Sequence, residues 1–280
     1  MILKGFEFNP IATFECGQCF RWERHKEGYI GVVENWIVSV QPKGADYVVS
    51  VLNDGKVQGV LERYFDCETD YLKMDEVLSQ KDAHLKEAVS LYHGMRLLRQ
   101  DPFETLMSFI ISANNNIPKI KMAVTELSER FGDYLGTIEG RDYYSFPVAE
   151  VLANETLESL SVKGIGYRNK GVLNTCKRIV ETSFNLEELK SMSFETARQE
   201  LETFYGVGEK VANCVLLFSL DHREAFPIDT WMKRMLRELY GVEDHPKAYA
   251  TFAKSYFTQY SGYAQQLLFY YMRQNRGGKS

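Results

Sequence analysis

A lysine and an aspartate are the residues of this sequence best placed to do covalent chemistry together. Lys210 follows the turn 206–208, and Asp229 comes nineteen residues after the lysine. Apolar spacing after Lys210 predicts a helix over 209–220, which would be roughly 18 Å long, and residues 221–228 can return the chain to its start. We therefore expect the two side chains to meet.

The position of each residue in its predicted helix favours chemistry. The helix field at a first turn disfavours an ammonium, so it favours the neutral amine that a lysine nucleophile needs. Asp229 precedes Thr230 and Trp231 and is a predicted N-cap, which would keep its carboxylate ionised. A surface lysine and a capping aspartate are the ordinary explanations of each residue alone. Their conjunction with the turn before Lys210 favours the functional interpretation.

That turn has the shape of a helix-hairpin-helix, which we expect at about residues 197–220. Gly206 and Gly208 permit a tight turn, and Val207 between them can pack back into the helix pair. The unpaired amides at the start of the second helix then face outward and can bind a DNA phosphate. The segment is not a dinucleotide fingerprint, because no strand precedes it and the spacing to the next glycine fails.

Length and composition set the outer limits. The chain has 280 residues, 45% of them hydrophobic and 25% charged, which excludes disordered, collagenous and coiled-coil classes. A net charge of −5 removes any argument for DNA binding from bulk basicity, although a hairpin binds phosphates with few basic side chains. No stretch reaches the roughly 18 apolar residues of a membrane span. We expect a cytoplasmic protein that does not bind membranes.

The five cysteines predict neither a disulfide framework nor a metal centre. They are an odd number scattered over two hundred residues, which is typical of a reducing compartment. Cys16 and Cys19 form a CxxC, but no second CxxC or histidine pair completes a zinc site, and no run of four cysteines could hold an iron–sulfur cluster.

The fold predicted around these residues is α+β, an antiparallel sheet followed by a helical region. We expect one domain over residues 1–82 and a helical domain over 83–280. Aromatic and β-branched runs separated by turn residues predict four strands. These strands are expected at 19–23, 29–33, 36–40 and 47–52.

Nearly everything after Ala83 predicts helices interrupted by glycine or proline. Asp101-Pro102 followed by Glu104 is a capping-box pattern at the start of a helix that should stop at Asn114. A second helix is expected from near Pro118 to Gly132.

Five separated motifs match one known family in order. They are Cys16-Gly-Gln-Cys-Phe-Arg-Trp22, Ser112-Ala-Asn-Asn-Asn-Ile117 with Arg99-Gln-Asp-Pro102 upstream, Gly164-Ile-Gly-Tyr-Arg168, the block from Gly206 to Asp229, and Gly262-Tyr-Ala-Gln-Gln-Leu-Leu-Phe269. Over nearly the whole chain, the sequence resembles 8-oxoguanine DNA glycosylases of the helix-hairpin-helix superfamily.

The resemblance implies an enzyme of base excision repair. It would flip an oxidised guanine out of duplex DNA, cut the glycosidic bond and nick the strand by β-elimination. Lys210 would attack C1′ and form a Schiff base, and Asp229 would orient it and stabilise the cationic sugar. The partner would be double-stranded DNA containing oxidised guanine, bound by a monomer. No cofactor is required, although the hairpin backbone is a candidate site for a monovalent or divalent cation.

Family likeness also implies a pocket for the damaged base. The backbone carbonyl of Gly17 would accept the N7 proton that distinguishes 8-oxoguanine from guanine, a hydrogen bond whose loss discriminates by at most a few kcal/mol. Cys214 and Phe269 would sandwich the base, with Gln265 on its Watson–Crick edge. For Cys214 and Phe269, ordinary helix core is the competing interpretation.

The base left opposite the lesion would contact three further residues. In the family an asparagine and an arginine at the positions of Asn114 and Arg168 touch the unpaired cytosine, and a tyrosine at the position of Tyr167 wedges into the stack. A second cytosine contact in relatives is an arginine at the position of Lys119, and lysine lacks the planar fork for bidentate recognition. Trp231 stands where relatives can have histidine, so stacking would replace a phosphate contact.

Other functions stay open at this point. One is a glycosylase of the same superfamily for an adenine or an alkylated base, against which Lys210 and Gly17 argue. Another is a DNA-binding module that keeps the hairpin without chemistry. A small-molecule enzyme built around Gly164-Ile-Gly166 is less compatible with the sequence, because no βαβ context surrounds those glycines.

Overall fold

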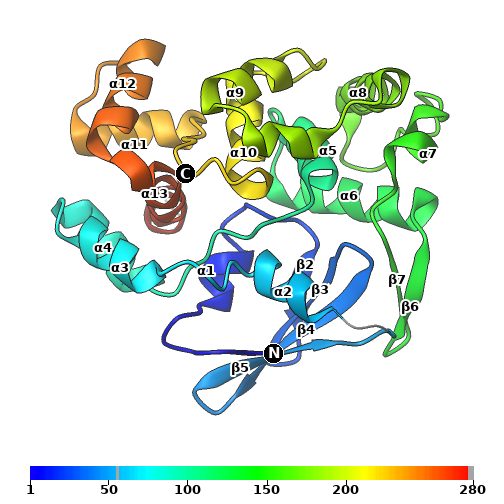
Figure 1. The fold of residues 1–280 in the computed structure, drawn as a ribbon, viewed down its shortest axis with the longest axis horizontal. Helices are drawn as coiled ribbons and strands as arrows, with labels where there is room; N and C mark the ends of the chain where they lie inside the picture. The colour runs from blue at the N-terminus through cyan, green and yellow to red at the C-terminus, as the bar shows by residue number, and fades with distance from the viewer. Residues whose placement is uncertain (55–56, 277–280) are drawn as a thin grey trace.

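The computed structural model describes residues 1–54 and 57–276 and has the predicted α+β architecture (Figure 1). Five strands form an antiparallel sheet in the order β1-β5-β4-β3-β2. The strands are β1 (Ile2–Leu3), β2 (Trp22–His25), β3 (Gly28–Val33), β4 (Trp36–Lys43) and β5 (Asp46–Val51). The last three match the expected strands closely, whereas β2 begins three residues later than expected because Cys19 lies in a buried bend before it.

Aromatic packing holds the sheet to the short helices beside it. Trp22 on β2 stacks on Phe14 of α1 (Pro10–Phe14) with ring centroids 4.2 Å apart. The indole N–H of Trp22 donates to the Tyr64 hydroxyl of α2 (Gln58–Tyr64) at 2.7 Å. A buried indole that satisfies its one donor fixes the orientation of the strand. The segment between α1 and β2, which contains Gly17, is thereby held at both ends.

Helices make up most of the remaining chain. They are α3 (Tyr71–Ser79), α4 (Ala83–Tyr92), α5 (Pro102–Ser112), α6 (Ile117–Phe131), α7 (Ala149–Ala153), η1 (Gly166–Arg168), α8 (Asn169–Thr182), η2 (Leu186–Ser191), α9 (Phe194–Glu202), α10 (Glu209–Ser219), α11 (Thr230–Tyr240), α12 (Pro246–Tyr256), η3 (Thr258–Tyr260) and α13 (Ser261–Arg276). Helix α10 packs against both α5 and α9, and α13 packs against α4 and α11 (Figure 1).

A β-hairpin inside the helical region contradicts the expectation of helices throughout. Strands β6 (Tyr134–Ile138) and β7 (Arg141–Tyr144) pair antiparallel around a turn where Glu139 and Gly140 have positive φ. Tyr143 is buried with Ile30 and Ile37, so the hairpin covers one face of the N-terminal sheet. That apolar contact is made by a segment far away in the sequence, which is why helical periodicity nearby was misleading.

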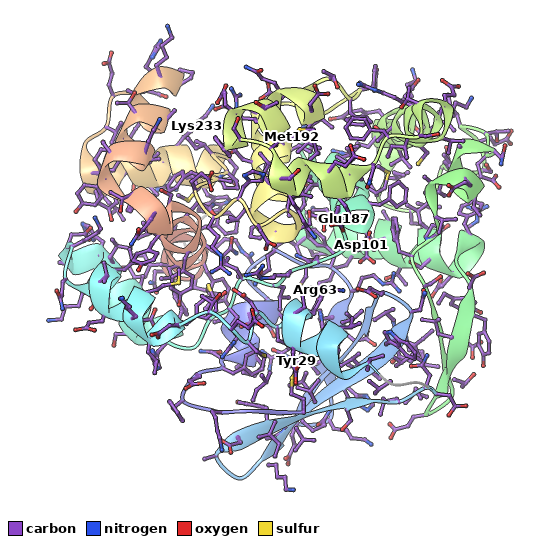
Figure 2. The ribbon with its side chains drawn as sticks, viewed as in Figure 1. Tyr29, Arg63, Asp101, Glu187, Met192 and Lys233 are labelled. Carbon is purple, nitrogen blue, oxygen red and sulfur yellow. The ribbon has the colours of Figure 1, made fainter. Side chains whose placement is uncertain are left out.

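Helix α5 begins as predicted and ends slightly early. Asp101 accepts the Glu104 N–H at 2.7 Å as the N-cap, and the helix stops at Ser112 rather than Asn114. The Glu104 carboxylate does not complete a capping box; it pairs with the buried Arg21 guanidinium at 3.8 Å. Asp101 lies beside Glu187 (Figure 2), and its pKa is raised by burial, with Glu34 and Glu187 adding to the effect.

Helix α6 lies close to where it was predicted, with the Asn116 side chain as its N-cap and Gly132 as its C-cap. Within residues 1–54 and 57–276, no helix combines the length and the apolar character that crossing a bilayer requires.

Candidate active site

Lys210 occupies the first turn of α10, where the sequence placed it. Its ammonium donates to the Ser112 hydroxyl at 3.1 Å and lies 5.0 Å from the centre of the Phe109 ring. Ser112 in turn donates to the Phe109 carbonyl at 2.7 Å, so its lone pairs face the lysine. Both partners belong to α5 and are about a hundred residues away in the chain. Nothing in the local sequence indicated that Ser112 would hold the lysine.

Asp229 is the N-cap of α11, as predicted, and accepts the Met232 N–H at 2.9 Å. Burial raises its pKa, opposed by that hydrogen bond and by the positive charge of Lys210. Desolvation therefore outweighs the cap and the lysine charge in setting the direction of this shift. The lysine charge is close enough to act on Asp229.

Asn213 holds the loop that delivers Asp229, a role that sequence reasoning missed. The side-chain oxygen of Asn213 accepts the Phe226 N–H at 3.2 Å, and the side-chain amide nitrogen donates to the Glu209 backbone carbonyl at 2.8 Å. The side chain is buried in the otherwise apolar face of α10. A polar residue on a buried helix face needs partners, and that rule is the signal that could have identified it.

The turn before Lys210 forms the expected hairpin between α9 and α10. Gly206 has φ +81° and Gly208 is the N-cap residue, with no side chain capping the first turn. Val207 is buried, as predicted for the residue that plugs the helix pair. A side-chain Cβ at Gly208 would meet nothing within 4 Å, so the amides there are open to a ligand.

Gly17 lies against α13 in a tight bend with φ +87°. A Cβ on Gly17 would be 3.1 Å from Ile117 and 3.7 Å from the Phe269 ring, so a side chain would crowd this space. Gln266 of α13 donates to the Cys16 carbonyl at 3.0 Å and ties the bend to the helix. The structure therefore places Gly17 next to Phe269.

The other predicted pocket residues lie on α10 and α13. Cys214, one turn after the lysine, is buried, and burial raises its pKa to about 11 while Lys210 opposes the rise. The Gln265 amide donates to the Pro227 carbonyl at 3.2 Å. The side-chain oxygen of Gln265, Oε1, is buried, and among the residues described it finds no hydrogen-bond donor. Phe269 is half-buried.

The three asparagines after α5 divide into two kinds. Asn115 donates to the Ile111 and Gly164 carbonyls, each at 3.0 Å, and Asn116 caps α6. Asn114 is exposed with φ +49°, and its side chain points to no partner in the residues that the structure describes. Asn114 is thus the one of the three whose side chain has no partner among the described residues, and its neighbours close the turn.

Arg168 and Tyr167 lie beside this turn on η1. The Arg168 guanidinium donates to the carbonyls of Ala113, Asn114 and Ile165, and it packs 4.6 Å from the centre of the Tyr167 ring. Tyr167 is 66% exposed, which suits a wedge. Three of the five guanidinium N–H groups of Arg168 are therefore bound to backbone oxygens, and two remain for a base.

Lys119 and Trp231 lie at the starts of two helices. Lys119 is exposed in the first turn of α6, and its backbone is close to Gly164, where an added Cβ would come within 2.3 Å of the Lys119 carbonyl oxygen. It therefore shares a face with η1. Trp231, in the first turn of α11, is half-buried next to Asp229.

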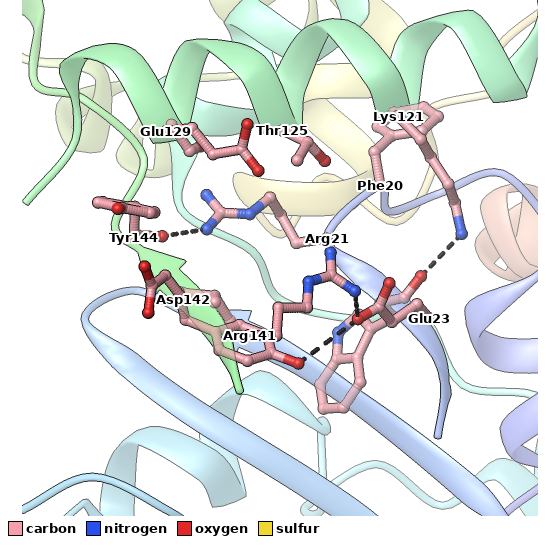
Figure 3. A pocket seen from close by; sticks show the side chains of 13 residues that line it. Phe20, Arg21, Glu23, Lys121, Thr125, Glu129, Arg141, Asp142 and Tyr144 are labelled. Atoms are coloured by element: carbon pink, nitrogen blue, oxygen red, sulfur yellow. Dashed lines mark hydrogen bonds and ion pairs between the residues drawn. The ribbon is translucent and has the colours of Figure 1, made fainter. Parts of the chain in front are cut away.

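A small cavity lies away from these residues, between β2, α6 and β7 (Figure 3). It measures about 110 Å³ and is crossed by hydrogen bonds from Lys121 to the Trp22 carbonyl and from Arg141 and Tyr143 to Glu23. These bonds join the sheet to α6 and the β6–β7 hairpin. The cavity is a junction between elements, and its residues are not those of the Lys210 cluster.

Among the residues described, no group of three or more histidine, cysteine, aspartate or glutamate side chains could hold a metal ion. Cys16 and Cys19 are buried, and burial raises the pKa of both thiols.

Two family signatures cover the chain in succession. Residues 1–106 match the N-terminal domain of 8-oxoguanine DNA glycosylases, and residues 107–257 match the HhH-GPD superfamily of base excision DNA repair proteins. The N-glycosylase/DNA lyase OGG1 of Arabidopsis thaliana is 32% identical over 94% of this chain and 77% of its own length.

Solved structures agree with these matches. The 8-oxoguanine glycosylase/lyase of Clostridium acetobutylicum, in complex with double-stranded DNA containing cytosine opposite 8-oxoguanine, superimposes with a TM-score of 0.89. It is 41% identical, over 96% of this chain and 93% of that one. The structure of MBOgg1 with a low-affinity DNA ligand gives a TM-score of 0.91 at 38% identity, over 98% and 95% of the two chains.

Proposed function

Because the chain belongs to the 8-oxoguanine DNA glycosylases of the HhH-GPD superfamily, we propose that Lys210 and Asp229 are the catalytic pair of its reaction. The protein is a bifunctional N-glycosylase/DNA lyase: it excises 8-oxoguanine from duplex DNA and cleaves the strand at the resulting site. Lys210 is proposed as the nucleophile and Asp229 as the group that stabilises positive charge on the sugar.

One observation carries this assignment. The Lys210 ammonium is held at 3.1 Å by Ser112, in a first helical turn, where its charge acts on both the buried Cys214 and the capping Asp229. The Ser112 hydroxyl orients the lysine side chain in the first turn of α10, on the same helix as Cys214 and close to Asp229. An amine in such a setting can become a nucleophile.

In the first step, the glycosidic bond between C1′ and the base breaks, and its electron pair leaves with the base. The Lys210 amine forms the new bond to C1′ and gives up a proton. The carboxylate of Asp229, fixed by the Met232 N–H, stabilises the cationic sugar as the base departs. A preorganised charge of this kind is worth several kcal/mol in a site that excludes water.

In the second step, the opened sugar forms a Schiff base with Lys210. The protonated imine withdraws electrons, so C2′ can lose a proton to a water molecule. The electrons of that C–H bond form a double bond between C2′ and C3′, and the bond from C3′ to the 3′ phosphate breaks with its electron pair leaving on the phosphate. A DNA strand that already has an abasic site, and so carries no damaged nucleobase, can undergo this step with Lys210. Base excision and strand cleavage can therefore be measured separately.

The remaining residues are proposed to recognise the two bases and the backbone. Gly17, Cys214, Gln265 and Phe269 would surround the flipped 8-oxoguanine; Asn114, Lys119, Tyr167 and Arg168 would face the opposite base; and Gly206, Gly208 and Trp231 would lie along the DNA backbone. The contacts that support this are the proximity of Gly17 to Phe269 and the shared face of Asn114, Lys119 and η1. Lys210 joins the two groups through Ser112, which precedes Asn114 by two residues.

The chemistry needs no cofactor, since the lysine supplies the nucleophile and the imine supplies the electron sink. We propose that the open amides at Gly208 bind a DNA phosphate and that any cation would sit on the hairpin backbone. A monomer acting in the cytoplasm on double-stranded DNA with oxidised guanine completes the proposal.

A duplex with a single 8-oxoguanine opposite cytosine tests the proposal. The protein should release the base and leave a strand ending in an unsaturated sugar, the product of β-elimination. An undamaged duplex should stay intact. Base release that leaves the strand whole after a long incubation would contradict the lyase step.

A further inference from the structure

Three side chains on one face of α13 end in groups that match the two edges and the ring face of a flipped purine. They are Gln265, Phe269 and Arg273, spaced four residues apart. Four residues are about one helical turn, so the three share a stripe, and the first and last lie about 12 Å apart along the axis. A purine with one hydrogen bond at each end has a similar length.

The two ends of this stripe carry unsatisfied groups of opposite kind. The Gln265 carbonyl oxygen is a buried acceptor, and the Arg273 Nη1 is a buried donor, and neither has a partner in the described part of the chain. Buried polar atoms without partners cost free energy and are uncommon in folded proteins. Two on one helix face, on either side of an aromatic ring, indicate a ligand that supplies a donor at one end and an acceptor at the other.

Other contacts fix Arg273 without using that donor. Its guanidinium lies 5.8 Å from the Phe269 ring centre and 5.9 Å from that of Tyr270, and Nη2 makes a long hydrogen bond of 3.4 Å to the Glu15 carbonyl. The Nη1 atom lies 3.5 Å from the position that a Cβ on Gly17 would take. The free donor is therefore next to the bend whose carbonyl is proposed to accept the N7 proton.

We infer that Arg273 reads the C8 oxygen of the flipped 8-oxoguanine by donating a hydrogen bond from Nη1. This inference rests on the proposed function. C8 is the neighbour of N7, so a donor beside the Gly17 bend reaches the atom attached there. Guanine has a hydrogen at C8, and its entry would leave Nη1 unpartnered. Arg273 thus adds a second discriminating contact at the edge opposite Gln265.

The experiment replaces Arg273 with Met, which keeps the packing on Phe269 and removes the donor. Arg130→Met is the matched control, because Arg130 is an exposed residue at the far end of α6. Single-turnover excision of 8-oxoguanine and cleavage of a preformed abasic site are measured for each. Arg273→Met should excise on the order of 10- to 100-fold more slowly, the range expected for a hydrogen bond from a charged donor. Abasic-site cleavage should change less than about threefold.

A binding measurement isolates recognition from catalysis. In a Lys210→Gln background, the ratio of affinities for 8-oxoguanine and guanine duplexes should fall on the order of tenfold with Arg273→Met. Arg273→Lys, which keeps a donor on a flexible stem, should recover part of the loss and serves if the Met variant folds poorly.

The outcomes distinguish a failure of the Arg273 inference from a failure of the proposed glycosylase function. If the unaltered protein fails to excise 8-oxoguanine, the proposed function is wrong. If it excises the base and Arg273→Met matches Arg130→Met, only the role of Arg273 is overturned. Equal losses in excision and abasic-site cleavage would make Arg273 a general structural residue and would also overturn the inference.

Discussion

The Lys210 ammonium and the Ser112 hydroxyl meet at 3.1 Å and join the first turn of α10 to the last residue of α5. Ser112 precedes Asn114, the asparagine that faces the opposite base in our proposal. One hydrogen bond therefore links the proposed nucleophile to the loop that would sense the partner strand.

Removing this hydroxyl should slow the reaction without stopping it. Ser112→Ala leaves the lysine in place but without the acceptor that orients it, and we expect excision to slow about 3- to 30-fold. Single-turnover excision of 8-oxoguanine opposite cytosine measures this. Ser255→Ala, at an exposed position on α12, is the control. An unchanged rate for Ser112→Ala would mean that DNA binding moves the lysine away from α5.

Asp229→Asn should slow excision severely while the fold survives. Asparagine also caps helices, so α11 should form normally, but the charge that stabilises the cationic sugar is lost. We expect excision to slow on the order of 100- to 1,000-fold, with a melting temperature close to that of the parent. A loss of only a few-fold would refute the electrostatic role of Asp229.

Lys119→Arg should sharpen the choice of opposite base. A flexible ammonium can meet acceptors on thymine as well as cytosine, whereas a planar guanidinium can hold cytosine's two acceptors together. Excision opposite each of the four bases measures selectivity, with Lys86→Arg on α4 as the control. The parent should already favour cytosine through Asn114 and Arg168, and the guanidinium of the arginine variant should strengthen that preference. Equal selectivity in the two proteins would rule out this role for Lys119.

The buried pair of Glu104 and Arg21 should make folding stability depend on pH. Burial raises the pKa of Glu104 from 4.5 to about 7, although Arg21 opposes the rise. The folded protein then binds more protons than the unfolded chain between these values, so stability should fall as the pH rises from about 5 to about 8.

Glu104→Gln removes this titration. The difference in free energy of unfolding between parent and variant should change by about 1–3 kcal/mol over that pH range, measured by urea denaturation. Glu150→Gln, at an exposed position, should follow the parent curve. A Glu104→Gln curve parallel to that of the parent would contradict the raised pKa.

Local rules predicted those features of the fold that depend on neighbouring residues. Asp101 and Asp229 cap helices as their sequences indicate, and Gly206 adopts the positive φ that the hairpin turn requires. The β6–β7 hairpin was not predicted, because its buried Tyr143 packs on Ile37, which is over a hundred residues earlier in the chain. Sequence spacing cannot reveal such a contact.

The candidate site likewise contains residues that the local sequence predicts and partners that it does not predict. Lys210 and Asp229 could be singled out because helix ends have known electrostatics. The partners that orient these groups were not predictable: Ser112 holds Lys210 across 98 residues, and Arg168 folds onto the carbonyl of Ala113. The direction of the Asp229 pKa depends on how deeply tertiary packing buries it, which its sequence neighbours do not report.

Lys210 should become covalently attached to the DNA during the reaction. Borohydride added to the protein and an 8-oxoguanine duplex reduces the Schiff base to a stable bond, and peptide mapping by mass spectrometry then locates the modified residue. We predict a trapped band with the adduct on Lys210, no band for Lys210→Gln although this variant still binds the duplex, and a normal band for Lys86→Gln. A band of parental yield from Lys210→Gln, or an adduct on another residue of the parent, would contradict the account.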